Sequence, residues 1–194
     1  DDAVAQMKRI LATYPPQATP PEGQEDPVLG LPAAIVNMRR GLGDEAEANR
    51  ELRAALGYFE GLLARPMPPE LEARVRARIL RANLELNQAS RALQEAYTLE
   101  RLVVVTPSLH PMMAEIAFAK GKIKADQGSP RDALALFEDQ IQARRFASEA
   151  GARTLEMLTE ATEAAEWAGD YVQAAALSAR AEAMGSAPIH IRWL

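Results

Sequence analysis

The chain has 194 residues, a formal net charge of -5 and no cysteine. Its length allows one domain with a sizeable core, and its richness in Ala, Leu, Glu and Arg favours an all-helical protein. The negative net charge argues against broad binding of nucleic acid or anionic membranes. The absence of cysteine excludes a disulfide framework and a thiolate metal site.

Targeting and membrane-spanning segments are not visible in the sequence. No apolar run approaches the roughly 20 residues that a spanning helix needs, and the first residues lack the features of a signal peptide. We therefore expect a cytoplasmic protein that binds neither membranes nor nucleic acid. Because the chain begins with Asp rather than Met, we also expect a processed product or a piece of a longer protein.

The first 27 residues predict a short helix followed by a linker. Apolar residues at helical spacing predict the helix over Ala3–Thr13. Pro15 and Pro16 end it, because proline cannot continue the backbone hydrogen-bond ladder. Residues 17–27 are rich in Pro, Gly and acidic side chains, a composition typical of a loop or linker.

The middle of the chain predicts helices at residues 28–42, 44–64, 70–86 and 91–105. Gly43 ends the first of them, and Asp44 followed by Glu47 has the spacing of a capping box. A proline-rich run separates the second helix from the third. Steps of three and four predict one apolar stripe along the third helix. That stripe consists of Leu71, Val75, Ile79, Ala82 and Leu86.

In the C-terminal part, Leu109–Pro111 leads into a predicted helix that reaches Gln127, and further helices are predicted from Pro130 to about Phe146, from Ser148 to Ala168 and from Tyr171 to Met184. Gly128 and Gly169 separate the helices of each pair. An apolar tail of unassigned form follows at residues 188–194.

A repeat runs through these helices. Its turn residues are Gly43, Asn87, Gly128 and Gly169, which are separated by 44, 41 and 41 residues. An alanine follows five residues after each turn, at Ala48, Ala92, Ala133 and Ala174. Gly and Asn suit a left-handed helix end, and alanine lets two helices approach closely. Self-similarity at a fixed period is typical of a helical solenoid.

This pattern resembles the tetratricopeptide repeat (TPR), in which a turn glycine is followed by alanine and then by a bulky residue. Gly128, Ala133 and Phe137 fit that pattern, and Gly121 matches the glycine of the family's first helix. The resemblance implies an all-α fold, a right-handed superhelical solenoid of antiparallel helix pairs. It would cover residues 28–187, between an N-terminal segment (1–27) and a C-terminal tail (188–194). The alternative is an irregular helical bundle.

The repeat period is longer than the roughly 34 residues usual for the family. In that respect the repeats look like those of about 40 residues found in bacterial regulators and sensor proteins. There, such a domain lies beside a DNA-binding or nucleotide-cyclase domain.

The sequence lacks the residue constellations that enzymes and metal sites need. Its two histidines, His110 and His190, have no second His or Cys to share a metal. No Gly-rich loop follows a strand, and no Ser has the context of a nucleophile elbow. We therefore expect no enzymatic activity, no catalytic residue, no metal and no cofactor.

The resemblance also implies a binding groove, lined by the first helix of each pair. Counting six, ten and thirteen residues back from each turn gives the candidate positions. With Arg40 added for its charge, the candidate partner contacts are Asn37, Arg40, Arg74, Arg81, Phe118, Lys122, Thr159 and Glu163.

The charges of this groove are unevenly distributed. It is basic in its middle, at Arg74, Arg81 and Lys122, and acidic toward the C-terminus. Basic groups at this spacing suit a carboxylate or an acidic peptide. The alternative is a solvated charged face with local pairs, such as Arg81 with Glu85.

The aromatic residues divide into packing residues and one open case. We expect Phe137, Tyr171 and Tyr97 to pack between repeats. We expect Tyr58, Phe59 and Trp167 to pack within helix pairs. Phe118 occupies a groove position, so it is either a partner contact or a core residue.

These observations favour a protein- or peptide-binding scaffold. The alternative is a ligand- or peptide-responsive sensor domain that controls a fused or partner output domain, in transcription or cyclic-nucleotide signalling. Self-association remains open as well, because the exposed ends of a solenoid need covering.

Overall fold

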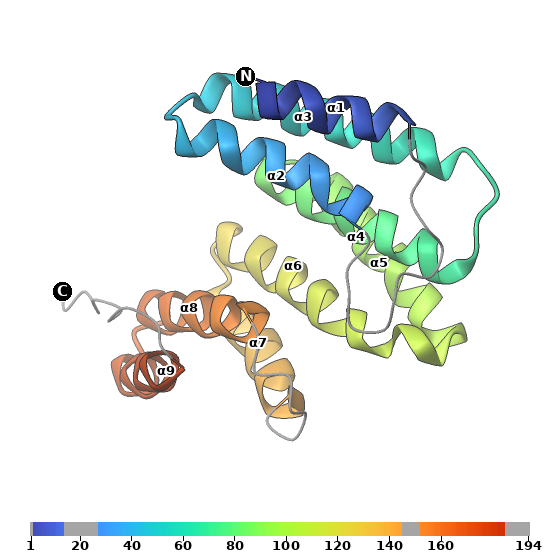
Figure 1. Cartoon of the computed structure of the whole chain (residues 1–194). Helices are drawn as coiled ribbons and strands as arrows, with labels where there is room; N and C mark the ends of the chain where they lie inside the picture. Colours follow the sequence, from blue (N-terminus) through green and yellow to red (C-terminus); the bar gives the residue numbers. More distant parts are fainter. Residues whose placement is uncertain (1, 14–26, 145–151, 185–194) are drawn as a thin grey trace. The chain divides into compact units, whose positions relative to one another are not determined.

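The computed structural model describes residues 2–13, 27–144 and 152–184, and within these ranges the regular structure is helical (Figure 1). The helices are α1 (Asp2–Thr13), α2 (Pro27–Gly41), α3 (Glu45–Leu63), α4 (Pro69–Glu85), α5 (Ala89–Val105), α6 (Met113–Asp126), α7 (Pro130–Arg144), α8 (Ala152–Trp167) and α9 (Tyr171–Ala183), with a 3-10 helix, η1 (Pro107–Met112), before α6. The all-α prediction is confirmed.

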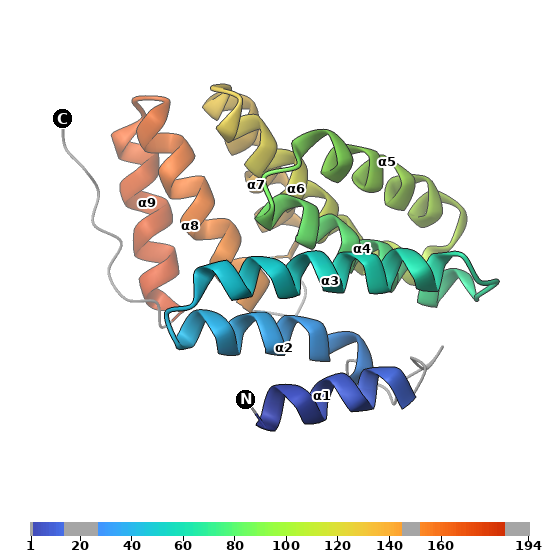
Figure 2. The same ribbon diagram turned by 90° about the horizontal axis from the view of Figure 1, so that it is seen from above.

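The chain divides into two compact units, Asp1–His110 and Pro111–Leu194, called unit 1 and unit 2 below. In unit 1, α1 packs on α2, and α2 to α5 pack each on the next (Figure 2). In unit 2, α6 to α9 do the same, and α6 also contacts α8. Short turns join α2 to α3, α4 to α5, α6 to α7 and α8 to α9, so each of these pairs runs antiparallel. The division into segments 1–27, 28–187 and 188–194 stays a prediction.

The four predicted turns share one backbone geometry. Gly43, Asn87, Gly128 and Gly169 have φ values of 76°, 55°, 77° and 79°, in the left-handed region that glycine and asparagine tolerate best. At each turn the following residue donates its N–H to the carbonyl five residues before it, as in Asp44 to Arg39 (3.1 Å) and Asp170 to Ala165 (2.9 Å). This is the Schellman motif, which satisfies the last carbonyls of a helix.

Side-chain caps start the next helix at two of these turns. The Asp44 carboxylate accepts a hydrogen bond from the backbone N–H of Glu47, and Asp170 accepts one from Gln173, both at 3.0 Å. A carboxylate at this position satisfies an orphan N–H and complements the positive end of the helix. The predicted cap at Asp44 is therefore confirmed.

The repeat alanines are buried within the helix pairs. Ala48, Ala92, Ala133 and Ala174 are each fully buried. A larger side chain at these positions would push the paired helices apart.

Gly121 plays a related role in unit 2. A Cβ atom built on it would lie 2.5 Å from Cε1 of Phe137, and the Phe137 ring is itself fully buried. The ring of α7 therefore rests directly on the backbone of α6.

Each unit has its own hydrophobic core. The core of unit 1 joins α2, α3 and α4, through residues such as Leu29, Val36, Leu52, Phe59 and Val75. Leu71, Val75, Ile79 and Ala82 of the predicted α4 stripe are buried, and Leu86 packs against them. The core of unit 2 surrounds Phe137 and Met157 and is otherwise rich in alanine.

Some sequence-based expectations are wrong. Tyr97 and Trp167 were expected to pack, yet their side chains are 55% and 64% exposed. The segment Leu109–Pro111, expected to lead into a helix, lies in the 3-10 helix η1, and α6 begins at Met113, because Pro107 and Pro111 favour the tighter turn.

Other expectations fall partly outside the described residues. These are the linker at 17–26, the junction at 145–151, and the tail with His190 and Trp193. Pro27 is the first residue of α2, and Pro32 is accommodated inside that helix.

Candidate functional site

The candidate site in each unit is one face of the first helix of each pair: α2 and α4 in unit 1, and α6 and α8 in unit 2. We call it the first-helix face and define it by the residues six, ten and thirteen positions before each turn residue. None of these twelve positions is buried. Five core positions of the same helices, Val36, Val75, Ile79, Ile123 and Ala161, are at most 3% exposed. The face is therefore accessible along each helix.

In unit 1 the face belongs to α2 and α4 and carries Asn37, Arg74 and Arg81; the added candidate Arg40 lies on α2 outside the defining positions. Asn37 is exposed, and the three arginines are half-buried. Nη1 of Arg40 lies 2.9 Å from a carboxylate oxygen of Glu85, and its Nε lies 3.8 Å from Glu45. Arg40 therefore ties the C-terminal end of α2 to the end of α4.

Arg74 differs from Arg40 in its surroundings. Its Nη1 atom is buried and has no hydrogen-bond partner among the described residues. A buried donor without an acceptor costs about 1–3 kcal/mol. The side chain would therefore gain free energy by turning toward an acceptor that a partner supplies.

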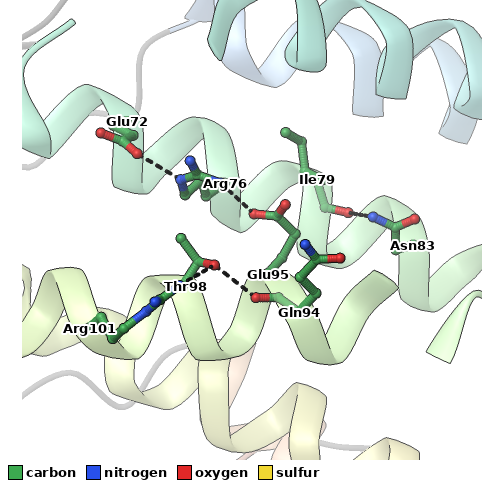
Figure 3. A network of polar contacts seen from close by, with 8 residues as sticks. All are labelled: Glu72, Arg76, Ile79, Asn83, Gln94, Glu95, Thr98 and Arg101. Carbon is green, nitrogen blue, oxygen red and sulfur yellow. Dashed lines mark hydrogen bonds and ion pairs between the residues drawn. The ribbon is translucent and has the colours of Figure 1, made fainter. Parts of the chain in front are cut away.

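Arg76 lies between the candidate arginines on α4 but points to another neighbour (Figure 3). Its guanidinium donates to Glu72 (2.8 Å) on the same helix and to Glu95 (3.0 Å) on α5. Burial by itself would lower the pKa of Arg76, but the hydrogen bonds and charges of Glu72 and Glu95 outweigh it and raise the pKa. This network joins α4 to α5 and holds the face of α4 in place.

Asn83 also contributes to this framework. It is 2% exposed, and its side-chain amide donates to the carbonyl of Ile79 at 2.9 Å (Figure 3). Its Oδ1 atom has no hydrogen-bond partner among the described residues. Asn83 lies in the last turn of α4, where its own carbonyl accepts the Schellman bond from Gln88 (2.8 Å).

In unit 2 the face belongs to α6 and α8 and carries Phe118, Lys122, Thr159 and Glu163. Phe118 is half-buried, packs against the core and lies 6.2 Å from the Phe137 ring centroid. The hydroxyl of Thr159 donates to the carbonyl of Leu155 (3.1 Å). Glu163 is exposed. Phe118 thus serves the core, and only part of its ring faces outward.

Lys122 is engaged by an acidic neighbour. Its Nζ atom lies 2.8 Å from Oε1 of Glu160 on α8. Burial by itself would lower the pKa of Lys122, but Glu160, Asp126 and Glu163 together outweigh it and raise the pKa. In unit 2 the positive charge of Lys122 is therefore compensated by the carboxylate of Glu160. The α8 side of the face is acidic.

Trp167 is a candidate contact residue on α8 that the sequence pattern did not indicate, since it was expected to pack. It follows Glu163 by four positions and Glu156 by eleven, so all three lie on the same face of α8. Its ring is 64% exposed. Extending the count to two residues before the turn would have placed it on the first-helix face.

Metal clusters and membrane-spanning helices are not found among the described residues. They contain no group of three or more His, Asp or Glu side chains that could hold a metal. None of the described helices has the length and apolarity needed to cross a bilayer.

Comparison with solved structures identifies the architecture. The TPR-like repeats of a Podosopora anserina protein described as a kinesin light chain, in a Q17M form, match with a TM-score of 0.53 at 17% identity over 94% of this chain and 85% of that chain. A second structure of these repeats gives 0.50 at 17% identity over 95% and 86%. The chain has a TPR-like helical-repeat fold.

Other comparisons add little to this assignment. BtubC (BKLC) from P. vanneervenii aligns over 100% of this chain and 92% of its own, with a TM-score of 0.47 and 13% identity. No protein-family model and no curated protein matches the sequence. The two kinesin light chain matches above confirm the TPR-like prediction for the fold. The bacterial regulator type stays a prediction.

Proposed function

We propose that this TPR-like chain is a scaffold that binds an acidic peptide segment of another protein on the first-helix face of unit 1. Helical-repeat proteins use extended surfaces of stacked helices for binding. The observation that carries the proposal is Arg74, whose buried Nη1 has no acceptor among the described residues. A carboxylate of the partner would satisfy this guanidinium through charge-assisted hydrogen bonds.

The neighbouring charges support an acidic partner. Arg81 shares the face with Arg74, and Arg40, which pairs with Glu85, also lies on α2; both are half-buried. Half-buried arginines lay their stems on the helix and keep part of the guanidinium accessible. An acidic segment crossing α2 and α4 would therefore meet several planar donors, the geometry that suits carboxylate recognition.

Unit 2 would bind a different kind of partner segment under this proposal. Its Lys122 is compensated by Glu160, so we assign the acidic peptide to unit 1 alone. Glu163 and the exposed ring of Trp167 suit a basic or apolar segment, because an aromatic face attracts cations. Such a segment would be a second contact.

Peptide selection from a random 12-residue phage library would test the proposal without knowledge of the natural partner. The wild type should select peptides rich in Asp and Glu, whose binding weakens as salt rises. The double variant Arg74→Glu/Arg81→Glu should lose those peptides. Arg53→Glu is the matched control, because Arg53 is exposed on α3 of the same unit and outside the face. Acidic peptides that bind the double variant and the wild type equally would contradict the proposal.

We further propose that the chain has no enzymatic activity and acts in the cytoplasm. The sensor alternative, with an output domain in transcription or cyclic-nucleotide signalling, stays a prediction. So does self-association. A cavity beside α1 is the feature that favours a ligand-responsive role.

A further inference from the structure

A cavity of about 410 Å³ lies between α1, α2 and α3 in unit 1. Its volume falls within the roughly 300–1,000 Å³ of typical small-molecule sites. The walls are mostly apolar and include Leu11 of α1, Ile35 of α2, and Ala54 and Tyr58 of α3. None of these residues belongs to the first-helix face.

One ion pair interrupts the apolar lining. The Nζ atom of Lys8 on α1 lies 2.6 Å from Oε1 of Glu51 on α3, and both side chains line the cavity. The two partners are unequally placed, because the Glu51 side chain is 7% exposed and that of Lys8 is 52% exposed. The carboxylate is thus fixed inside the unit, whereas the ammonium can reach water.

This asymmetry determines which ligand charge the cavity can accept. A buried carboxylate must keep a cationic partner, since an unpaired buried charge is costly. Lys8 can give up that role cheaply by swinging into solvent, because half of its side chain is already hydrated. Glu51 has no such route, since its neighbours Leu52 and Ala55 are buried in the core of unit 1.

We propose that this cavity binds a small molecule with an apolar body and a primary ammonium group. The ammonium takes the place of Lys8 on Glu51, and the apolar body lies against Leu11, Ile35 and Tyr58. A carboxylate ligand would face the fixed charge of Glu51 and be repelled. A neutral ligand would bury the same apolar area without the charge-assisted hydrogen bond.

α1 itself leaves room for such a ligand. Of its apolar residues Val4 is buried, but Met7, Ile10 and Leu11 are only half-buried. The ligand would cover part of this remaining apolar surface. Binding should therefore also hold α1 more firmly on α2 and α3.

Isothermal titration calorimetry of the full chain with three isosteric probes tests the proposal. The probes are 4-phenylbutylamine, 4-phenylbutan-1-ol and 4-phenylbutyrate. We expect saturable 1:1 binding, with the amine at least about tenfold tighter than the alcohol, because the ammonium pairs with Glu51 inside the cavity while the displaced Lys8 ammonium regains water. The butyrate should bind more weakly than the alcohol. No saturable binding of the amine, or equal binding of amine and alcohol, would overturn the proposal.

Three variants locate the binding site. Glu51→Gln should abolish the preference for the amine over the alcohol. Lys8→Met should tighten amine binding severalfold, because it removes the internal competitor for Glu51. Ala54→Trp should block all three probes, since Ala54 is an exposed lining residue whose enlargement fills the cavity without disturbing the core. Circular dichroism checks that each variant is folded.

Lys8→Met distinguishes most clearly between a ligand that replaces Lys8 and a ligand that binds to Lys8. If Lys8 were itself the anchor of an anionic ligand, this variant would lose binding of the butyrate. Weaker amine binding in Lys8→Met, or a full amine preference in Glu51→Gln, would show that the ammonium does not replace Lys8. If Glu51→Gln fails to fold, the other two variants still test the proposal, because amine binding should become tighter in Lys8→Met and be lost in Ala54→Trp.

Discussion

Units 1 and 2 use the same turns to present different surfaces. Both contain Schellman turns at a left-handed residue and a fully buried alanine five positions later. Yet the first-helix face carries Arg74 and Arg81 in unit 1, and Glu156 and Glu163 in unit 2. The repeat thus constrains the backbone and the contact points of the helices, and the charges between those points are free to differ.

The cores differ in a similar way. In unit 1 aliphatic side chains of α2, α3 and α4 surround Phe59. In unit 2 many alanines leave space for one large ring, Phe137, which rests on Gly121. The stability of unit 2 should therefore depend on fewer side chains than that of unit 1.

The largest expected effect follows from replacing this ring. Phe137→Ala should lower the free energy of unfolding by about 3–5 kcal/mol, because it empties a fully packed site. If the units are energetically separate, hydrogen exchange measured by mass spectrometry should rise in α6 to α9 and stay unchanged in α2 to α4. Equal acceleration in both units would show that they unfold together.

The next effect concerns the network that joins α4 to α5 in unit 1. Arg76→Met keeps the apolar stem but leaves Glu72 and Glu95 without their donor. Since hydrogen bonds to charged groups contribute about 1.5–3 kcal/mol, we expect a loss of that order in chemical denaturation. Arg50→Met is the control, because Arg50 is 70% exposed and pairs only with Glu47 of its own helix among the contacts described. It should cost under about 0.5 kcal/mol.

The turns provide a smaller and unequal pair of effects. Gly128→Ala in unit 2 should cost about 1–2 kcal/mol, because a Cβ atom disfavours the left-handed region. Asn87→Gly in unit 1 should leave stability nearly unchanged, since Asn87 already adopts φ 55° and glycine tolerates it better. Thermal unfolding of both variants measures the difference. A destabilised Asn87→Gly would indicate that the asparagine side chain contributes beyond its backbone conformation.

The smallest expected effect is the pH dependence of Lys122. Its pKa is raised in the folded chain, so its contribution is fully present below the unfolded pKa of roughly 10.4 and is lost as the pH rises through the higher folded pKa. Because the pair with Glu160 is partly exposed, we expect under about 1 kcal/mol. Glu160→Gln should flatten this alkaline loss in urea unfolding measured above roughly pH 10. An unchanged pH profile would contradict the role of Glu160.

The sequence by itself determined where the helices end and how the pairs approach. Gly43, Gly128 and Gly169 end helices because a left-handed residue is a local requirement, and buried alanines mark close contacts at fixed spacing. The same count placed the first-helix face on accessible positions. These signals lie within a few residues of one another, so the sequence carries them directly.

Only the tertiary structure decided which side chains meet across helices. The contacts of Lys122 with Glu160, Arg40 with Glu85 and Lys8 with Glu51 join residues that are far apart along the chain. Their pairing depends on how neighbouring helices are rotated and shifted, which local patterns do not specify. For the same reason the cavity beside α1 could be found only once the helices were packed.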